Sequence, residues 1–303
     1  MTGAGTTGAG TGVGIIGLGV MGGRIARHFL VPEITLSVYD VLPDRRAELA
    51  AEGAHDAASP ADVAARCDVV LTSLPTAAQV EAVLFGRDGL ASGGRELVVI
   101  DLSTIGPAAA RDLAERAAAA GITFLDAAVA QGHAQAEAGT LTILAGGDRD
   151  VLDRYRPLLD RIANAVFHFG PSGAGQAAKL AYNLSGVVAV AGAAEGVRLL
   201  RGLGGDLRTF LDMLETVDAN FFFRRPARDA LAGSFEPGFR IRLALKDLDL
   251  VLSEGEQAGL TLPAGAATRE VLLAAVQVGF GDEHTSAMTK VHRVPPQPSG
   301  GRS

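Results

Sequence analysis

Lysine is scarce in this sequence. Lys179, Lys246 and Lys290 are the three lysines of the chain, although lysine and arginine together number 27. Arginine suffices wherever only a positive charge is needed, whereas burial can lower the pKa of lysine until it exchanges a proton. Two of the lysines lie in polar segments, Gly175-Gln-Ala-Ala-Lys179-Leu-Ala-Tyr-Asn183 and Leu245-Lys-Asp247. We therefore predict a chemical role for a retained lysine.

Cysteine and tryptophan are also nearly absent. The single cysteine, Cys67, excludes an internal disulfide framework. Its small and apolar neighbours predict a packed residue at the end of a helix and not a reactive thiol. The six histidines show no His-x-x-x-His spacing, and no Cys-x-x-Cys pair is present. We therefore expect no metal site.

The charge balance and the lack of long apolar runs exclude further classes of protein. The net charge is −7 without a basic run, the opposite of what a nucleic-acid backbone requires. The most apolar segment, 184–197, contains Glu195, which favours a buried helix over a membrane span. Residues 1–12 are mostly glycine, threonine and alanine and do not resemble a signal peptide. We expect a cytoplasmic protein with neither a nucleic-acid nor a membrane partner.

Short apolar runs alternate with helical segments over the first 170 residues, the βαβ pattern of a parallel sheet. Strands are expected at Val13–Ile16, Thr35–Asp40, Val69–Ser73, Leu97–Asp101, Thr123–Ala127, Leu141–Ala145 and Val166–Phe169. Helices are expected between them at Met21–Leu30, Pro43–Ala51, Ala77–Phe85, Pro107–Ala120 and Arg149–Arg161. Such a pattern predicts an α/β Rossmann domain.

The pattern changes at Gly170-Pro-Ser-Gly173, after which the segments are helical. Helices are expected at Ala174–Leu200, Leu207–Thr216, Arg225–Ala232, Ile241–Ala258 and Ala264–Val278. The chain is therefore predicted to contain a disordered lead-in (1–12), a Rossmann domain (13–171), an all-α C-terminal domain (172–288) and a flexible tail (289–303).

A glycine-rich turn, Gly17-Leu-Gly-Val-Met-Gly22, follows the first expected strand and opens the first expected helix. In a dinucleotide fingerprint the first glycine allows a tight turn and the second lets the backbone approach a pyrophosphate. The third allows the helix to pack closely on the strand. A lone glycine turn is weak evidence, but here the strand and helix that the motif requires are both expected.

The end of the second expected strand bears on the choice of dinucleotide. Asp40 stands where a carboxylate would accept the adenosine ribose hydroxyls and repel a 2′-phosphate, which favours NAD over NADP. Arg45 and Arg46 lie nearby; they form either a solvated helix face or a site for that phosphate. We therefore predict NAD, with NADP as the alternative.

Three polar residues mark the helix that begins near Ala174. Gln176, Lys179 and Asn183 are spaced so that they share one helical face. This face is either a polar stripe at the junction of two domains or part of a catalytic site. The residues alone leave both interpretations open.

Several motifs occur in order over nearly the whole chain, and together they resemble the 3-hydroxyisobutyrate dehydrogenase family, the β-hydroxyacid dehydrogenases. The matching segments are Gly17–Gly22, Ser73-Leu-Pro75, Asp101-Leu-Ser-Thr104 with Pro107, Asp126–Gly132, Ala138–Thr142 with Gly146-Gly147, Gly173-x-Gly-x-x-x-Lys179-x-x-x-Asn183, and Phe235-x-Pro-Gly-Phe239 with Leu245-Lys-Asp-Leu248. Several independent motifs in register are more specific than any one of them.

The resemblance implies hydride transfer between NAD(P) and a 3-hydroxy acid or its 3-oxo form, with Lys179 carrying the proton and Asn183 orienting substrate or lysine. It implies cofactor contacts from Gly17, Leu18, Gly19, Val20, Met21, Gly22, Asp40, Leu74, Pro75, Gln79, Thr104 and Lys246. It implies substrate contacts from Ala130, Gln131, Gly132, Lys179, Asn183 and Phe239. Relatives of this kind form dimers or tetramers through the helical domain, and the apolar stretch 184–190 is compatible with such an assembly.

The chain departs from the family pattern at several positions. Ala130-Gln131-Gly132 stands where the family usually has Ser-Gly-Gly, which is either a tolerated variation or a sign of a different substrate class. His284 replaces the usual aspartate and is expected at the surface or in a pocket. The run Phe221–Phe223 is expected to pack in the core, with one or two rings lining a cleft or subunit contact.

Two other functions remain open. Imine reductases look similar in fold and fingerprint but commonly have aspartate or tyrosine where this chain has Lys179. A non-catalytic NAD-binding sensor or scaffold would have no need of Lys179 and Asn183 together. Oxidation of 3-hydroxy acids with NAD, reduction of cyclic imines with NADPH, or cofactor binding without turnover would distinguish the three.

Overall fold

The computed structural model describes residues 11–217, 221–257 and 259–291. Residue contacts divide the chain into two compact units, residues 1–183 and 184–303. The predicted boundary at 171/172 precedes the long helix α9 (Ala174–Gly202), whereas the division by contacts falls inside that helix. Most of the predicted lead-in and tail lies outside the described residues. Thr11 and Gly12, however, already belong to the first strand, and Thr289 and Lys290 to a 3-10 helix.

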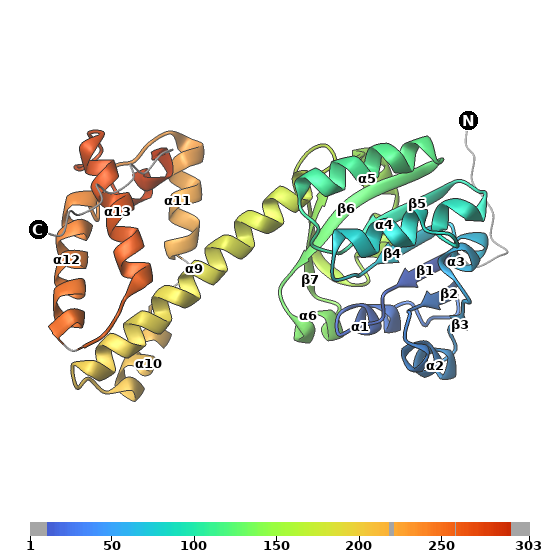
Figure 1. Ribbon diagram of the computed structural model, residues 1–303, viewed down its shortest axis with the longest axis horizontal. Coiled ribbons are helices and arrows are strands. Elements are labelled where there is room, and N and C mark those ends of the chain that lie inside the picture. Colours follow the sequence, from blue (N-terminus) through green and yellow to red (C-terminus); the bar gives the residue numbers. More distant parts are fainter. Residues whose placement is uncertain (1–10, 218–220, 258, 292–303) are drawn as a thin grey trace, which may run out of the picture. The chain divides into compact units, whose positions relative to one another are not determined.

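The first unit is built from alternating strands and helices (Figure 1). They are β1 (Thr11–Ile16), α1 (Gly22–Arg27), β2 (Ile34–Tyr39), α2 (Pro43–Ala51), β3 (His55–Asp56), α3 (Pro60–Arg66), β4 (Val69–Thr72), α4 (Ala77–Phe85), η1 (Leu90–Gly93), β5 (Leu97–Asp101), α5 (Pro107–Ala119), β6 (Ile122–Ala130), α6 (His133–Ala138), β7 (Leu141–Gly146), α7 (Arg149–Arg154), α8 (Arg156–Leu159) and β8 (Ala163–His168), followed by the start of α9. Seven of these strands match the predicted ones to within a few residues.

The strands form one sheet in the order β3-β2-β1-β4-β5-β6-β7-β8. The first six are parallel and have the strand order of a dinucleotide-binding Rossmann domain. The expectation of a wholly parallel sheet is wrong at β7, which pairs antiparallel to β6. The connection through the short helix α6 explains the reversal, because a parallel crossover needs a longer segment.

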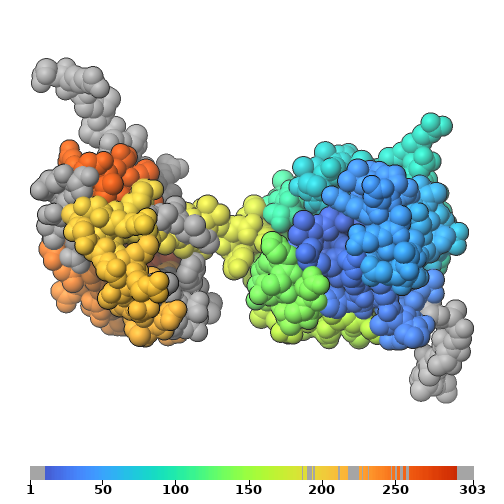
Figure 2. Space-filling model, turned by 90° about the horizontal axis from the view of Figure 1, so that it is seen from below, coloured from blue at the N-terminus to red at the C-terminus, as the bar shows by residue number. Residues whose placement is uncertain are grey.

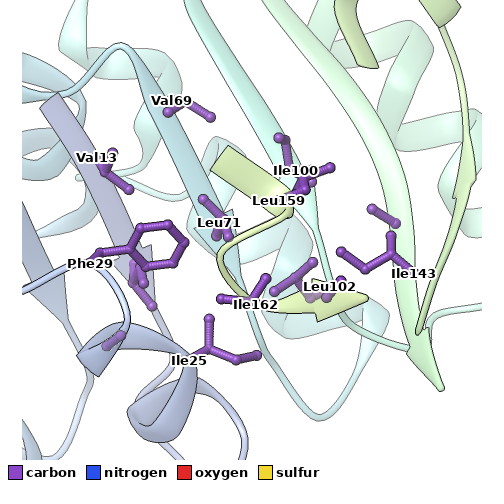
Figure 3. Packing of buried hydrophobic residues seen from close by; sticks show 14 of the residues in the cluster. Val13, Ile25, Phe29, Val69, Leu71, Ile100, Leu102, Ile143, Leu159 and Ile162 are labelled. Carbon is purple, nitrogen blue, oxygen red and sulfur yellow. The ribbon is translucent and has the colours of Figure 1, made fainter. Parts of the chain in front are cut away.

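Helices cover both faces of the sheet (Figure 1). Alternate residues of the strands point to opposite faces, and they meet two separate apolar clusters. On one face Ile25 of α1 and Phe29, which follows the end of α1, pack with Val13 and Leu71 (Figure 3). On the other face α3, α4 and α5 cover Ile16 and its neighbours in the sheet. The sheet is thus the middle layer of three.

Three helices of the first unit, α6, α1 and α2, lie side by side; they are green, dark blue and light blue on the face shown in Figure 2. Arg24 of α1 forms an ion pair of 2.8 Å with Glu137 of α6. Arg27 of α1 bonds Glu48 and Glu52 at the α2 side. Such exposed ion pairs contribute little stability each, but they connect the helix after the glycine turn to both neighbours.

Four elements of the first unit were not predicted: β3, α3, η1 and α6. Ser59 caps α3 through its side chain and Pro60 occupies the first turn, signals typical of a helix start. Cys67 follows this helix and is fully buried, as predicted for a small packed residue. Burial raises the pKa of its thiol to about 11, which disfavours the reactive thiolate.

The second unit contains the rest of α9 and the helices α10 (Leu207–Glu215), α11 (Phe221–Ala232), α12 (Ile241–Gln257) and α13 (Pro263–Gln277), with the 3-10 helix η2 (Thr285–Lys290). Its described core packs Ile241 of α12 against Leu272 and Ala275 of α13. An α/β Rossmann domain followed by a helical domain is thereby confirmed. The side chains of Phe221–Phe223 lie outside the described part, so their predicted packing stays a prediction.

Two polar residues anchor η2 in the second unit. His284 is buried and accepts the backbone N–H of Ser286 through Nδ1, so its expected surface position is wrong. Ser286 in turn donates to Asp229 at 2.5 Å.

Lys290 bonds Glu283 and lies 3.8 Å from the ring centre of Phe280. This third lysine therefore has a structural environment that explains its presence.

Candidate functional site

The glycine turn after β1 has the local geometry that its sequence predicts. Gly17 holds a φ of 89°, a conformation that glycine adopts without strain. A Cβ on Gly22 would lie 1.8 Å from the carbonyl oxygen of Gly17, so only glycine fits there. A Cβ on Gly19 would meet nothing closer than Arg45 Nη1 at 3.9 Å, which leaves its backbone open to a ligand.

A cavity of about 700 Å³ lies at the carboxyl ends of β1, β2 and β4. Eight of the predicted cofactor-binding residues line it: Gly17, Gly19, Val20, Met21, Asp40, Leu74, Pro75 and Gln79. Leu18 and Gly22 are buried in the turn itself, and Thr104 is exposed in the loop between β5 and α5. Ligands of open α/β sheets bind at the carboxyl ends of the strands, so the cavity lies where a cofactor is expected to bind.

Further lining residues were not singled out from the sequence. Ser59 and Pro60 line the cavity from the β3–α3 connection, and Arg87 and Asp88 line it from the segment after α4. Recognition of the two-residue strand β3 would have placed Ser59 at the same edge as Asp40, because both follow parallel strands. No motif marks Arg87 or Asp88.

Asp40 is buried and already holds the glycine turn. Its Oδ2 accepts the backbone N–H of Leu18 at 2.7 Å, and its Oδ1 accepts that of Leu42 at 2.9 Å. Arg45 approaches the same carboxylate at 3.5 Å, with nearly half of its side chain exposed. The residue that was predicted to contact ribose therefore also fixes the loop that was predicted to contact phosphate.

Asp126 anchors the beginning of α9. This fully buried carboxylate accepts the backbone N–H groups of Gly173 at 2.7 Å and Gln176 at 2.9 Å. A Cβ on Gly175 would lie 2.4 Å from the carbonyl oxygen of Leu144, so the helix passes directly over β7. Negative charge near a helix N-terminus is stabilising, and the contact fixes where the first turns of α9 start.

Gln176 joins the same helix to the loop after β5. Its Oε1 accepts the backbone N–H groups of Ile105 at 2.9 Å and Gly106 at 3.1 Å. Its Nε2 donates to the carbonyl oxygen of Ser103 at 2.9 Å. The side chain is fully buried, and an unpaired group here would be costly. Sequence reasoning placed Gln176 on the lysine face but did not find this role.

Asp101 lies beside Asp126 in the sheet and is also fully buried. Its Oδ1 accepts the hydroxyl of Thr72 at 2.7 Å and the backbone N–H of Ser103 at 3.1 Å. Burial raises the pKa of Asp101 to about 6, because the charged form loses its hydration. Ser103 accepts the backbone N–H of Leu74 at 2.9 Å, which ties the loops after β4 and β5 together.

Lys179 and Asn183 lie on α9 within the first unit, and both are half-buried. Burial lowers the pKa of the Lys179 amine, because poorly hydrated surroundings disfavour the ammonium form. The Nζ atom lies 5.4 Å from the ring centre of Tyr182. The spacing of four residues places Asn183 one turn further along the same face.

The predicted substrate segment follows directly on β6. Ala130 is buried at the end of the strand, while Gln131 and Gly132 are exposed before α6. Gln131 has a φ of 77°, and it is the single non-glycine with a positive φ in the described part of the chain. Ala130 and Gln131 help line a hollow of about 400 Å³ beside α9, which also includes Tyr182.

Two predicted site residues belong to the second unit. Lys246 lies in α12 and lines a hollow of about 550 Å³ with Arg242, Leu245 and Asp249 among others. Phe239 precedes α12 and is 44% exposed. Their predicted contacts with cofactor and substrate stay predictions.

Within the described residues, no group of three or more His, Cys, Asp or Glu side chains has an arrangement that could hold a metal ion. None of the helices described there combines the length and apolar character that a membrane crossing needs.

Comparison with known proteins finds relatives that match both units of the chain. Residues 12–170 match the NAD-binding domain of 6-phosphogluconate dehydrogenase. Residues 173–292 match the NAD-binding domain of NADP-dependent 3-hydroxyisobutyrate dehydrogenase. The chain is 35% identical over 270 residues to 3-hydroxyisobutyrate dehydrogenase of Pseudomonas aeruginosa, covering 84% of this chain and 89% of the relative. It is 33% identical over 279 residues to 2-(hydroxymethyl)glutarate dehydrogenase of Eubacterium barkeri, covering 91% and 93%.

A solved structure with lower identity shares the fold. The V8 variant of the imine reductase from Myxococcus stipitatus, in complex with NAD⁺, superposes with a TM-score of 0.83 at 20% identity, over 92% of this chain and 98% of that one. At such identity the likeness extends to the fold alone.

The fold, the cavity at the glycine turn and these matches together define an oxidoreductase that binds a nicotinamide dinucleotide. Within this class, the chain belongs to the 3-hydroxyisobutyrate dehydrogenase family. The family assignment predicted from the motifs is therefore confirmed.

Proposed function

We propose that the protein is an NAD-dependent dehydrogenase of a 3-hydroxy acid, or equally a reductase of the corresponding 3-oxo acid or semialdehyde, in which Lys179 moves the proton. The observation that carries the proposal is the position of Lys179. It is a half-buried amine with a lowered pKa on a helix whose start is fixed by Asp126 and Gln176.

The cofactor would occupy the cavity at the glycine turn. The open backbone at Gly19 would face the pyrophosphate, and Asp40 would accept the ribose hydroxyls. Leu74, Pro75, Gln79 and Thr104 would lie toward the nicotinamide, and Lys246 would be a further cofactor contact. The nicotinamide accepts or donates the hydride when bound. The chain's own residues must hold it and manage the proton.

NAD is the expected partner because of the charge at the ribose end. The buried carboxylate of Asp40 would stand against a 2′-phosphate, while its bonds to Leu18 and Leu42 hold it in place. Arg45 partly offsets this charge at 3.5 Å. The carboxylate of Asp40 is more buried than the guanidinium of Arg45, and its negative charge would therefore decide the preference for NAD over NADP.

Lys179 would act as the general base in oxidation and the general acid in reduction. An ordinary lysine amine, with a pKa of about 10.4, is too basic to exchange a proton well near neutrality. Burial lowers that pKa, which increases the neutral fraction available to take the hydroxyl proton. Asn183 would hold the substrate or the lysine from one turn away, and Ala130, Gln131, Gly132 and Phe239 would contact the rest of the substrate.

A substrate panel tests the proposal. We expect NAD-dependent oxidation of 3-hydroxy acids that is lost when Lys179 is replaced. Reduction of cyclic imines with NADPH, and no oxidation of hydroxy acids, would instead indicate an imine reductase. Tight cofactor binding without turnover on either panel would indicate a non-catalytic protein.

We also propose that the active form is a cytoplasmic homodimer or homotetramer. The support for an assembly is the apolar exposure of α9, where Leu184, Val187 and Val188 are 67%, 70% and 53% exposed. Such exposure of large apolar side chains is typical of a surface that another chain covers. Light scattering together with gel filtration would give the mass in solution, and a monomer would contradict the assembly.

A further inference from the structure

Gln131 holds a backbone conformation that is unfavourable for a residue with a Cβ. A residue with a Cβ seldom adopts a positive φ, whereas glycine does so freely. Gln131 nevertheless has a φ of 77° directly after β6. Unfavourable backbone conformations of this kind persist where the surrounding structure enforces them, and they are concentrated at functional sites.

The side chains around this residue form a hollow with uncharged walls. Its volume is about 400 Å³, within the range of small-molecule sites. Ala130, Leu144, Phe169, Ala178 and Ala181 supply apolar surface, while Gln131, Thr142 and Tyr182 supply neutral polar groups. We call this hollow the β6–α9 pocket.

The β6–α9 pocket adjoins the amine that is proposed to carry the proton. Tyr182 lines the pocket, and its ring centre lies 5.4 Å from Lys179 Nζ. A hydroxy acid that presents its C3 hydroxyl to Lys179 can therefore direct the substituent on the neighbouring carbon, C2, along the Tyr182 side of α9.

We propose that the β6–α9 pocket receives an uncharged, apolar C2 substituent of the substrate and that Gln131 limits the size of that substituent. This inference rests on the proposed function. A carboxylate in the pocket would lose its hydration without gaining a cationic partner from the lining residues, which is unfavourable. The side chain of Gln131 occupies space at the pocket wall that a glycine at the same φ would leave open.

The test is a series of 3-hydroxy acids that carry hydrogen, methyl, ethyl, propyl or carboxymethyl at C2, with kcat/KM measured in the wild type, Gln131→Gly and Gln131→Asn. Glycine suits the observed φ, so Gln131→Gly is expected to fold and to unfold at a higher temperature. Asparagine keeps an amide and tolerates the conformation but is one methylene shorter. The pair therefore separates size from backbone strain.

We expect the wild type to favour the shorter alkyl substituents and to use the carboxymethyl acid at least about tenfold less well than the propyl acid. The ratio of propyl to methyl kcat/KM should rise roughly tenfold in Gln131→Gly and by less in Gln131→Asn. An unchanged ratio in both variants would overturn the role of Gln131. A preference of the wild type for the carboxymethyl acid would overturn the apolar assignment.

The same series separates this inference from the proposed function. Lysine-dependent oxidation of any member supports the proposed function whatever the preference among substituents. If neither NAD nor NADP supports oxidation of any member, and the 3-oxo forms are not reduced, the proposed function and this inference fall together.

Discussion

The side-chain amide of Gln176 donates a hydrogen bond of 2.9 Å to the carbonyl oxygen of Ser103. With the two N–H groups that the same side chain accepts from Ile105 and Gly106, it connects α9 to the loop that carries Thr104. Lys179 follows Gln176 by three residues, which is less than one helical turn. The side chain of Gln176 therefore contributes, together with Asp126, to the position of the amine relative to this loop.

Gln176→Leu should disturb both stability and catalysis. It leaves the buried carbonyl of Ser103 without its partner, at a cost of about 1–3 kcal/mol, and it also removes the acceptor of the partly buried N–H groups of Ile105 and Gly106. We expect a lower denaturant midpoint and a fall in kcat that exceeds any change in cofactor affinity. Denaturant unfolding, steady-state kinetics and the pH dependence of kcat would measure these effects. The exposed Gln277→Leu on α13 is the control.

Gln176→Glu refines this test. It keeps an acceptor for Ile105 and Gly106 but turns the donor toward Ser103 into an oxygen. If Gln176 positions Lys179, the glutamate variant should lower kcat and shift the pH limb assigned to the lysine. A stability loss with an unchanged kcat and pH profile would mean that the role is purely structural.

Asp101→Asn should change how stability depends on pH. The pKa of Asp101 is about 6 in the folded protein, against about 3.9 for an unfolded aspartate. Between these two pH values Asp101 binds more protons in the folded state than in the unfolded state. Its contribution to stability therefore falls as pH rises from about 4 to 6. Asparagine does not ionise, and the variant should gain on the order of 2 kcal/mol relative to wild type across that range.

Denaturant unfolding at pH 4 and pH 7 measures the relative gain of Asp101→Asn. The exposed Asp153→Asn on α7 serves as the control and should show little relative change. If the difference in unfolding free energy between Asp101→Asn and the wild type did not change with pH, the raised pKa of Asp101 would be contradicted.

Glu195→Gln should weaken the second unit. The buried carboxylate of Glu195 accepts the backbone N–H groups of Ala264 at 2.6 Å and Gly265 at 2.9 Å, at the start of α13. Glutamine retains one acceptor but presents an N–H₂ group to the other donor. We expect a loss of about 1–2 kcal/mol. The exposed Glu256→Gln on α12 should be nearly neutral, and equal effects of both variants would rule out the capping role.

Asp40→Asn should shift the cofactor preference toward NADP. The amide removes the charge that opposes a 2′-phosphate while keeping an oxygen that can accept the N–H of Leu18. The ratio of kcat/KM for NADP to that for NAD should rise by about tenfold, which corresponds to roughly 1.4 kcal/mol. A wild type that already prefers NADP would contradict the prediction of NAD and would indicate that Arg45 dominates.

Local sequence signals were sufficient for much of the fold. Gly17 and Gly22 could be interpreted from neighbouring residues, because a turn and a close helix–strand contact are local requirements. The start of α9 near Ala174 was equally visible from the glycines and proline before it. The antiparallel direction of β7 was not, since an apolar strand has the same pattern whichever way it runs.

The site contacts that escaped prediction join residues far apart in sequence. Asp126 bonds Gly173, and Gln176 bonds Ser103; neither pairing has a signature in either segment. The positive φ of Gln131 was hidden for a different reason, because glutamine gives no sign of a left-handed conformation. The available signal lay in the motif comparison, because the family usually has glycine at this position and glycine adopts a positive φ without strain.

The pH dependence of turnover in both directions tests the central claim most directly. If Lys179 carries the proton, kcat/KM for oxidation should rise with pH through the lowered pKa of the amine, and that for reduction should fall through the same value. Lys179→Arg should retain cofactor affinity, lose most turnover and show neither limb. Wild-type turnover in the arginine variant, with the same pH profile, would contradict the assignment of the proton to this lysine.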